Sequence, residues 1–259
     1  MGKLDDFLRG AASVFHAAAG TSGKNVFTSA VIAAGGHSAR MGGDTTKQMM
    51  NLIGMPVIAH TLLAFEHAEC ISEIVVAAKE DEIPLYYEFA DKYGITKLSA
   101  VTAGGETRQI SVYNAFLKTS EKAKFVAFHD GARCLVTPDD IEKVFRAAVK
   151  YGAASAAVRA VDTVKIADKN GFIERTEDRN FVYMAQTPQI FGRNLYCAAA
   201  VTAREDGFEA TDDNSLAERI GYRVKLVECS PENLKITRPD DLKNAERILL
   251  ERRKKAEKC

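Results

Sequence analysis

The strongest constraint on the fold of this chain is the repeated alternation of short apolar runs with segments of helical periodicity. Apolar runs occupy residues 30–34, 74–78, 98–101, 125–128 and 153–158. Strands of a parallel sheet that is covered on both faces are short and apolar throughout, and helical crossovers join them. The pattern therefore predicts an α/β fold with a Rossmann-like, mostly parallel sheet and helices on both faces.

Helical patterns and end signals mark several of the segments between and after these runs. One pattern covers residues 83–93 and stops at Gly94, a residue suited to a left-handed helix end. Another opens at Pro138, and further helices are expected over residues 194–204 and 239–253. Short strands are expected at residues 224–227 and 234–236. With 259 residues and 46% hydrophobic residues, the chain is long enough for one full core.

The pattern changes between residues 159 and 183. Residues 161–166 alternate between apolar and polar, Asn170-Gly171 is a hairpin signal, and residues 172–175 form a second extended stretch. We therefore expect a β-hairpin arm over about 160–184 that projects from the sheet.

The first 20 residues place apolar side chains at helical spacing. This predicts an amphipathic N-terminal helix followed by a linker, so that residues 1–24 form an extension and residues 25–259 form the main domain. Because the polar face is not strongly basic, docking on the body or on a partner subunit is favoured over membrane binding.

Composition excludes several classes of protein. Lys+Arg and Asp+Glu both number 35, so no global field favours nucleic acid or an anionic membrane. The five cysteines are scattered and never form a C-x-x-C pair, which argues against a zinc site or a disulfide framework and fits a reducing cytoplasm. No run approaches the ~18 apolar residues of a membrane span. We expect a cytoplasmic protein with no nucleic-acid or membrane partner.

Three segments suggest phosphate chemistry at one edge of the sheet. The first apolar run leads into Gly35-Gly36, with Arg40 and Lys47 beyond, and this combination suits a nucleotide's phosphates. The pattern is neither the P-loop nor the dinucleotide-binding turn. An ordinary turn with solvated cations is the alternative.

A second glycine turn, at residues 104–105, precedes a predicted helix with an acid in its first turn and with Ser111 near the sheet edge; a well-capped surface helix is the alternative. Asp130 ends the run 125–128, where it is placed to hold a divalent metal or a ribose hydroxyl, with Arg133 beside it. A turn-capping role is the alternative for Asp130.

Taken in order, the motifs resemble those of the 2-C-methyl-D-erythritol 4-phosphate cytidylyltransferase family over roughly residues 28–250. The matching segments are A-G-G-x-x-x-R-M…K at 34–47, G-G-E-x-R-x-x-S at 104–111, H-D-x-A-R at 129–133, D-T-V-K at 162–165, D-R at 178–179, Q-T-P-Q at 186–189, T-D-D-x-S at 211–215 and N-x-K-I-T-R-P-D at 233–240.

This resemblance implies a nucleotidyltransferase domain over residues 25–259, and a reaction in which the phosphate of methylerythritol phosphate attacks the α-phosphate of CTP, with Mg²⁺ bridging the triphosphate. It also implies a homodimer in which the arm crosses into the neighbouring subunit, so that the active sites are shared. The residue roles that it implies fall into four groups: catalytic cations around the phosphates at Arg40, Lys47 and Lys235; the cytosine and ribose pocket at Ala34, Gly35, Gly36, Gly105, Glu106 and Ser111; the ribose and metal region at Asp130; and substrate binding at Arg133, Thr163, Arg179 and Thr187.

The sequence departs from the family pattern at Ser38, where a glycine is usual, at Glu106, where Asp is frequent, and at Cys134, where Pro is usual. Two alternative functions stay open. A ribitol-5-phosphate cytidylyltransferase would share the fold, CTP and most of the motifs. A non-catalytic nucleotide-binding regulatory protein would keep the fold without the reaction.

Overall fold

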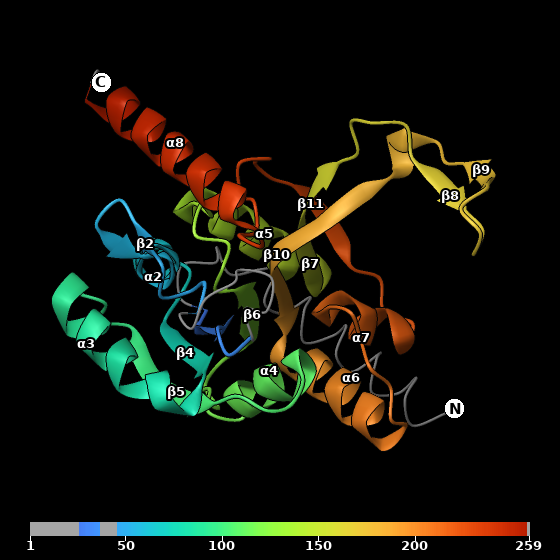
Figure 1. Cartoon of the computed structure of the whole chain (residues 1–259). Coiled ribbons are helices and arrows are strands. Elements are labelled where there is room, and N and C mark those ends of the chain that lie inside the picture. The colour runs from blue at the N-terminus through green and yellow to red at the C-terminus, as the bar shows by residue number, and fades with distance from the viewer. Residues whose placement is uncertain (1–25, 37–45, 258–259) are drawn as a thin grey trace.

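A seven-stranded sheet forms the centre of the molecule (Figure 1). The computed structural model describes residues 26–36 and 46–257. In this part of the chain the strand order is β11-β7-β10-β6-β1-β4-β5, and every neighbouring pair is parallel except the two pairs that β10 makes. The prediction of a mostly parallel α/β sheet is confirmed. The strands are β1 Thr28–Ala33, β4 Glu73–Ala78, β5 Leu98–Ala103, β6 Phe125–Asp130, β7 Ala153–Arg159, β10 Tyr183–Gly192 and β11 Lys225–Glu228.

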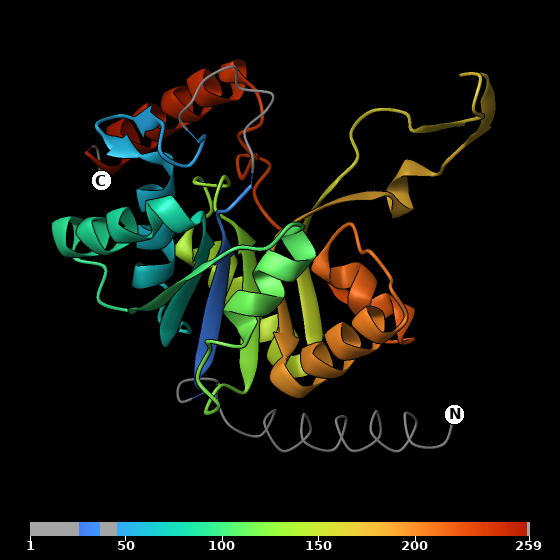
Figure 2. The same cartoon turned by 60° about the horizontal axis from the view of Figure 1, so that its bottom comes forward.

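Helices cover both faces of this sheet (Figure 2). One face packs against α2 Val57–His67, α3 Ile83–Tyr93 and α5 Pro138–Tyr151, and the other against α4 Arg108–Phe116, α6 Arg193–Glu205 and α7 Asp213–Arg219. The last helix, α8 Pro239–Ala256, packs beside the small hairpin of β2 Asn51–Leu52 and β3 Met55–Pro56. The helix of residues 83–93 ends at Gly94 with φ +69°, as predicted.

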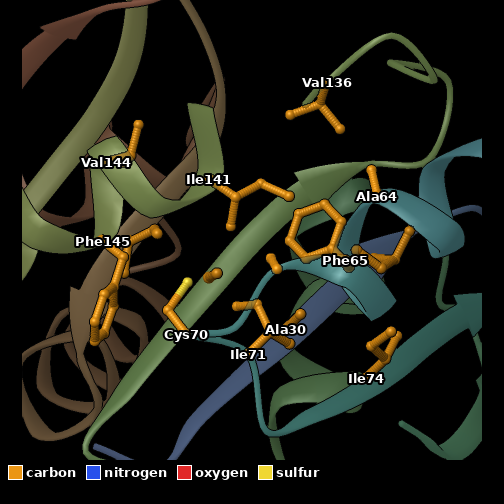
Figure 3. Close-up of a cluster of buried hydrophobic side chains, with 14 of the residues drawn as sticks. Ala30, Ala64, Phe65, Cys70, Ile71, Ile74, Val136, Ile141, Val144 and Phe145 are labelled. Atoms are coloured by element: carbon orange, nitrogen blue, oxygen red, sulfur yellow. The ribbon is translucent and has the colours of Figure 1, made fainter. Parts of the chain in front are cut away.

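The core explains why the central strands carry long apolar runs. On β1, Ala30 and Ile32 belong to the cluster under α2 and α5, while Val31 belongs to the cluster under α4 and α6. Figure 3 shows part of the first cluster, to which Phe65 of α2 and Ile141 of α5 both belong. Since successive side chains of a strand point to opposite faces, a strand covered on both faces needs apolar residues at successive positions.

The hairpin arm is present and projects from the body (Figures 1 and 2). Its two strands, β8 Lys165–Ala167 and β9 Ile173–Thr176, pair antiparallel, and Gly171 has φ +87° in the turn. The strands are shorter than predicted: residues 161–164 precede β8 rather than belonging to it. The pairing there stops at a single bond, which the Glu177 N–H donates to the Val164 carbonyl (3.0 Å).

One predicted strand is wrong. Residues 234–236 alternate like a strand, but they join no ladder; the Ile236 N–H donates one hydrogen bond to the Ala132 carbonyl (2.9 Å). Ile236 is buried in a separate cluster against α8 rather than at an edge of the sheet. Its alternation therefore reflects one buried side chain and an adjacent lysine that faces the site described below.

Two expectations concern the N-terminal extension and membrane association. Residues 1–24, for which we expect a helix and a linker, lie outside the described residues. Among the residues that are described, none of the helices has the length and apolar character needed to cross a bilayer.

Candidate active site

A cavity of about 540 Å³ opens at the carboxyl ends of β1, β4, β5 and β6. Ligands of open α/β sheets bind at this edge, because the loops that follow parallel strands meet there. The cavity brings together most of the residues that the sequence singled out: Gly35, Gly36, Lys47, Gly105, Glu106, Ser111, Asp130 and Lys235.

Glycine backbone forms one wall of the cavity. A Cβ atom on Gly35 would lie 3.3 Å from the Ala78 carbonyl oxygen, and one on Gly104 would lie 2.9 Å from the Ser111 hydroxyl. These contacts leave little room for a side chain at either position. The backbone at Gly35 therefore runs close to the end of β4, and at this wall a ligand would meet backbone rather than side chains.

Ser111 holds the second glycine loop in place. Its hydroxyl accepts from the Gly105 N–H (2.9 Å) and donates to the Thr107 carbonyl (2.8 Å). Thr107 caps α4, so Glu106 precedes the helix, and the expected acid in the first helical turn is wrong. The threonine hydroxyl accepts from the Ile110 N–H and so satisfies the donor that an acid would otherwise have served.

Asp130, the last residue of β6, is surrounded by three cations. Its Oδ1 lies 3.2 Å from Arg108 Nε, and its Oδ2 lies 2.9 Å from Lys235 Nζ and 3.6 Å from Arg133 Nε. Burial alone would raise the pKa of Asp130, but the attraction of Arg108, Lys235 and Arg133 outweighs it and holds the pKa well below its usual range. The cavity floor therefore carries an ionised carboxylate among three cations.

Thr187 and His129 fix the backbone beneath this carboxylate. The Thr187 hydroxyl oxygen accepts from the Asp130 N–H (3.1 Å) and lies 3.0 Å from His129 Nδ1. His129 Nε2 lies 3.2 Å from the Arg133 carbonyl, so the hydrogen-bond pattern assigns the proton to Nε2 and makes Nδ1 the acceptor for the threonine hydroxyl. Burial lowers the pKa of His129 to about 3, against the attraction of Asp130, and the ring is neutral.

Asn233 links the segment that carries Lys235 to the same floor. Its fully buried side chain donates to the Thr187 carbonyl (2.8 Å) and to Gln186 Oε1 (3.1 Å). Its own carbonyl accepts from Arg133 Nη1 (2.8 Å). These bonds place Lys235 and Arg133 on either side of Asp130, although about a hundred residues separate them in the chain.

Six predicted residues lie elsewhere or outside the described part of the chain. Ala34 is buried beneath the loop, where its N–H donates to the Ala77 carbonyl (2.7 Å). Thr187 and Arg133 contact Asp130 from behind and do not line the cavity. The arm carries Thr163 and Arg179, both exposed, and Arg179 Nη1 donates to the Val161 carbonyl (2.9 Å). Arg40 lies outside the described residues.

The sequence analysis assigned no role to two charged residues of the site. Arg108 lines the cavity and bridges Asp130 to the buried Asp213, with Nη2 2.8 Å from Asp213 Oδ2. Both residues belong to quoted motifs, G-G-E-x-R-x-x-S and T-D-D-x-S. Their pairing spans 105 positions, and no local pattern predicts it.

The donor set suits a metal that arrives with a ligand better than one held by protein alone. In the described part of the chain no three His, Cys, Asp or Glu side chains lie together in a way that would hold a metal ion. Asp130 nevertheless offers an ionised carboxylate at the cavity, and Mg²⁺ is commonly bound through one or two carboxylates together with substrate phosphates. These residues fit that second mode.

Comparisons with known proteins agree with this geometry. Residues 28–251 match the family model described as 2-C-methyl-D-erythritol 4-phosphate cytidylyltransferase. A protein of that name from Pelotomaculum thermopropionicum is 43% identical over 221 residues, which cover 85% of this chain and 93% of the relative. Another from Caldanaerobacter subterraneus is 42% identical over 222 residues, covering 85% of this chain and 98% of the relative.

Solved structures share the fold. The 4-diphosphocytidyl-2C-methyl-D-erythritol synthase of Anaerococcus prevotii superposes with a TM-score of 0.78 at 28% identity, covering 87% of this chain and 99% of that one. The 2-C-methyl-D-erythritol 4-phosphate cytidylyltransferase of Thermus thermophilus gives 0.69 at 31% identity, covering 86% and 98%. Since the family model spans the sheet, the cavity and the arm, the chain belongs to the 2-C-methyl-D-erythritol 4-phosphate cytidylyltransferase family.

Proposed function

We propose that this protein transfers CMP from CTP to 2-C-methyl-D-erythritol 4-phosphate in the non-mevalonate route to isoprenoids. A phosphate oxygen of the acceptor attacks the α-phosphorus of CTP, the bond from that phosphorus to the bridging oxygen breaks, and pyrophosphate leaves. The products are 4-diphosphocytidyl-2-C-methyl-D-erythritol and pyrophosphate. The observation that carries this proposal is the cavity in which Lys47 and Lys235 accompany Asp130 beside glycine backbone, in a chain of this family.

Positioning and charge do most of the work in such a transfer. Negative charge builds on the oxygens around the α-phosphorus, and cations already held in place stabilise it. We assign this role to Arg40, Lys47 and Lys235. The loops of Gly35, Gly36 and Gly105, with Glu106 nearby, would hold cytosine and ribose, and Ser111 supports them by fixing the second loop.

A divalent cation, Mg²⁺ in our proposal, supplies neutralisation of the triphosphate when it is bound. Asp130 is the residue that would hold it, because its carboxylate is ionised and lies at the cavity. Lys235 contacts the same carboxylate at 2.9 Å and is free to exchange that contact for a phosphate oxygen. Arg133 and Thr187 would orient the methylerythritol part from behind Asp130.

We further propose a homodimer in which the arm completes the partner's site. The arm exposes large apolar side chains, with Phe181 82% exposed, Val161 79% and Phe172 73%. Apolar surface of this kind on a thin projection favours burial against another chain. Thr163 and Arg179 would then bind the acceptor's phosphate in the neighbouring subunit, since both lie on the arm and outside the cavity of their own chain.

The remaining assignments are proposals of the same kind. We place the protein in the cytoplasm, supported by free cysteines at positions 70, 134, 197 and 229 of the described chain. We assign residues 1–24 to an extension that docks on the body or on the partner, and residues 25–259 to the nucleotidyltransferase domain with its arm at about 160–184.

Pyrophosphate release tests the proposed reaction. Purified protein with Mg²⁺ and CTP is offered 2-C-methyl-D-erythritol 4-phosphate or ribitol 5-phosphate, and ATP, UTP and GTP replace CTP in parallel. We expect release with CTP and the methylerythritol acceptor, with the highest kcat/KM for that pair.

The other outcomes are equally informative. A higher kcat/KM with ribitol 5-phosphate would keep the chemistry and move the acceptor. Binding of CTP without release for any acceptor would identify a nucleotide-binding regulatory protein and overturn the proposed reaction.

A further inference from the structure

Arg108 is a cation of the described cavity wall that joins two carboxylates. It is the first residue of α4, and its side chain is 32% exposed. The Nε atom lies 3.2 Å from Asp130 Oδ1, and the Nη2 atom lies 2.8 Å from Asp213 Oδ2. The planar guanidinium makes this fork possible, because its donors point in fixed directions that a lysine ammonium lacks.

Asp213 is the anchored end of this bridge. Its side chain is 2% exposed and it opens α7, whose start is held by buried polar bonds. The Asn214 N–H donates to Gln189 Oε1 (3.0 Å), and the Asn214 amide donates to the Ser155 hydroxyl (3.0 Å). Gln189 lies on β10 and Ser155 on β7, so the position of Asp213 is set by the sheet and not by the cavity.

The α6–α7 connection is also tied to the first turn of α4. The Gln109 amide donates to the Phe208 carbonyl (3.1 Å), and its oxygen accepts from the Ala210 N–H (2.8 Å). Arg108 therefore starts from a backbone that is fixed to the same segment as its partner Asp213. Both ends of the ion pair are set before any ligand binds.

The charges of Asp130, Arg108 and Asp213 affect how readily a divalent cation reaches Asp130. Asp130 has three cationic neighbours and carries one negative charge, so a divalent cation must compete with them for its oxygens. Asp213 compensates the charge of Arg108 through the shorter of its two contacts, which reduces that competition. Without the negative charge of Asp213, Arg108 would be bound to Asp130 alone.

We propose that Asp213 and Arg108 form a positioning pair that keeps the Asp130 carboxylate available to the divalent cation that enters with CTP. This inference rests on the proposed function. It assigns to the T-D-D-x-S segment a part in metal binding, although Asp213 does not line the cavity and Arg108 need not contact the metal.

The substitution Asp213→Asn tests the pair, because it keeps the shape of the side chain and removes its charge. Arg108 then turns fully to Asp130, and the local net charge rises by one. We expect Mn²⁺ to bind about tenfold more weakly in the presence of α,β-methylene-CTP, as measured by electron paramagnetic resonance. The KM for methylerythritol phosphate should stay within about twofold, since Arg133 and Thr187 are untouched.

Two further variants separate this role from a structural one. Asp206→Asn makes the same change at the other end of the α6–α7 connection, on a carboxylate that pairs with the surface residue Arg219, and should bind Mn²⁺ like the wild type. The double variant Arg108→Gln/Asp213→Asn removes both charges and leaves two amides in their place. We expect it to recover Mn²⁺ affinity to within about threefold of the wild type. If Asp213→Asn alone fails to fold, the Mn²⁺ affinity of this double variant tests the positioning pair in its place.

Contrary results fall into distinct classes. Folded Asp213→Asn protein with wild-type Mn²⁺ affinity, or a folded double variant that stays about tenfold weak, would overturn the positioning pair. Absence of CTP binding to the wild type in equilibrium dialysis would instead overturn the proposed function on which the pair rests.

Discussion

His129 carries no charge and does not line the cavity, yet it fixes two residues of the site. The Nε2–H group donates to the Arg133 carbonyl, and Nδ1 accepts from the Thr187 hydroxyl. The ring also packs against Phe65, with centroids 4.9 Å apart. This environment provides hydrogen bonds for a neutral imidazole and none for a second proton.

Because of this histidine, the folded protein should become less stable as the pH is lowered. Burial lowers its pKa from 6.5 to about 3 in the folded protein. Between these values the unfolded chain binds more protons, so the free energy of unfolding decreases as pH falls, by up to about 1.4 kcal/mol per pH unit. Urea unfolding at pH 7.5, 6.0 and 5.0 measures this slope.

Variants identify the residue responsible. His129→Gln should be less stable at neutral pH but should show a flatter slope, with His60, whose pKa is also lowered by burial, accounting for part of what remains. His67→Gln changes an exposed histidine at the end of α2 and should leave the slope as it is. An equal slope in His129→Gln would contradict the assignment.

At this scale the sequence predicted the positions that follow directly from a strand end. Asp130 and Arg133 were expected at the site because a buried run delivers them there, and both are found together. Arg108 and Asp213 were not, since a salt bridge across 105 positions depends on how α4 and α7 pack on the sheet. The sequence contains both residues but not the distance between them.

The turn after β6 depends on a glycine with no space around it. A Cβ atom on Gly131 would lie 2.8 Å from Ile58 Cδ1 and 3.1 Å from the Ala33 carbonyl oxygen. The Gly131 N–H donates to the same carbonyl (2.9 Å), and its own carbonyl accepts from the Thr61 hydroxyl (2.9 Å). The end of β6 is thereby held against the end of β1.

Gly131→Ala should lower the free energy of unfolding by about 1–3 kcal/mol, because the new methyl group must displace the Ile58 side chain and press on backbone. Urea unfolding measures the loss. Gly36→Ala is the matched control, since none of the described residues has an atom within 4 Å of a Cβ there, and the stability of this variant should change by less than about 1 kcal/mol. Equal losses for the two variants would show that the close contact is not the cause.

Prediction of whole elements succeeded where both faces are buried and failed where other forces act. The runs 74–78 and 125–128 are β4 and β6 because only a sheet covered on both faces buries such segments. Residues 234–236 imitate a strand because Ile236 packs under α8. The antiparallel course of β10 has no signature in its apolar pattern, because periodicity reports burial and not direction.

At the scale of the whole molecule, the arm separates two groups of proposed site residues. Lys235 lies at the cavity of its own chain, whereas Arg179 is carried by the arm that we assign to the partner's site. A dimer that contains one Lys235→Met chain and one Arg179→Ala chain would then have both defects in one site and neither in the other. We expect the purified mixed dimer to recover about half of the wild-type kcat/KM for methylerythritol phosphate.

The control pairs two defects on the arm. A mixed dimer of Thr163→Ala and Arg179→Ala chains has a defective arm at both sites and should recover no activity. The Arg179→Ala homodimer should show a raised KM for methylerythritol phosphate with little change in the affinity for CTP. Failure of the first mixed dimer to exceed its parent homodimers would show that each chain completes its own site.

The position of β10 has a consequence for how the chain is made. This strand pairs with both β6 and β7, but it follows both of them in the sequence. Until β10 has been synthesised and has left the ribosome, the edges of β6 and β7 that will receive it stay unpaired, for a period on the order of seconds. Exposed strand edges attract other chains. Strand edges in the interior of the finished sheet, and not only those at its rim, are therefore open to misassembly during synthesis.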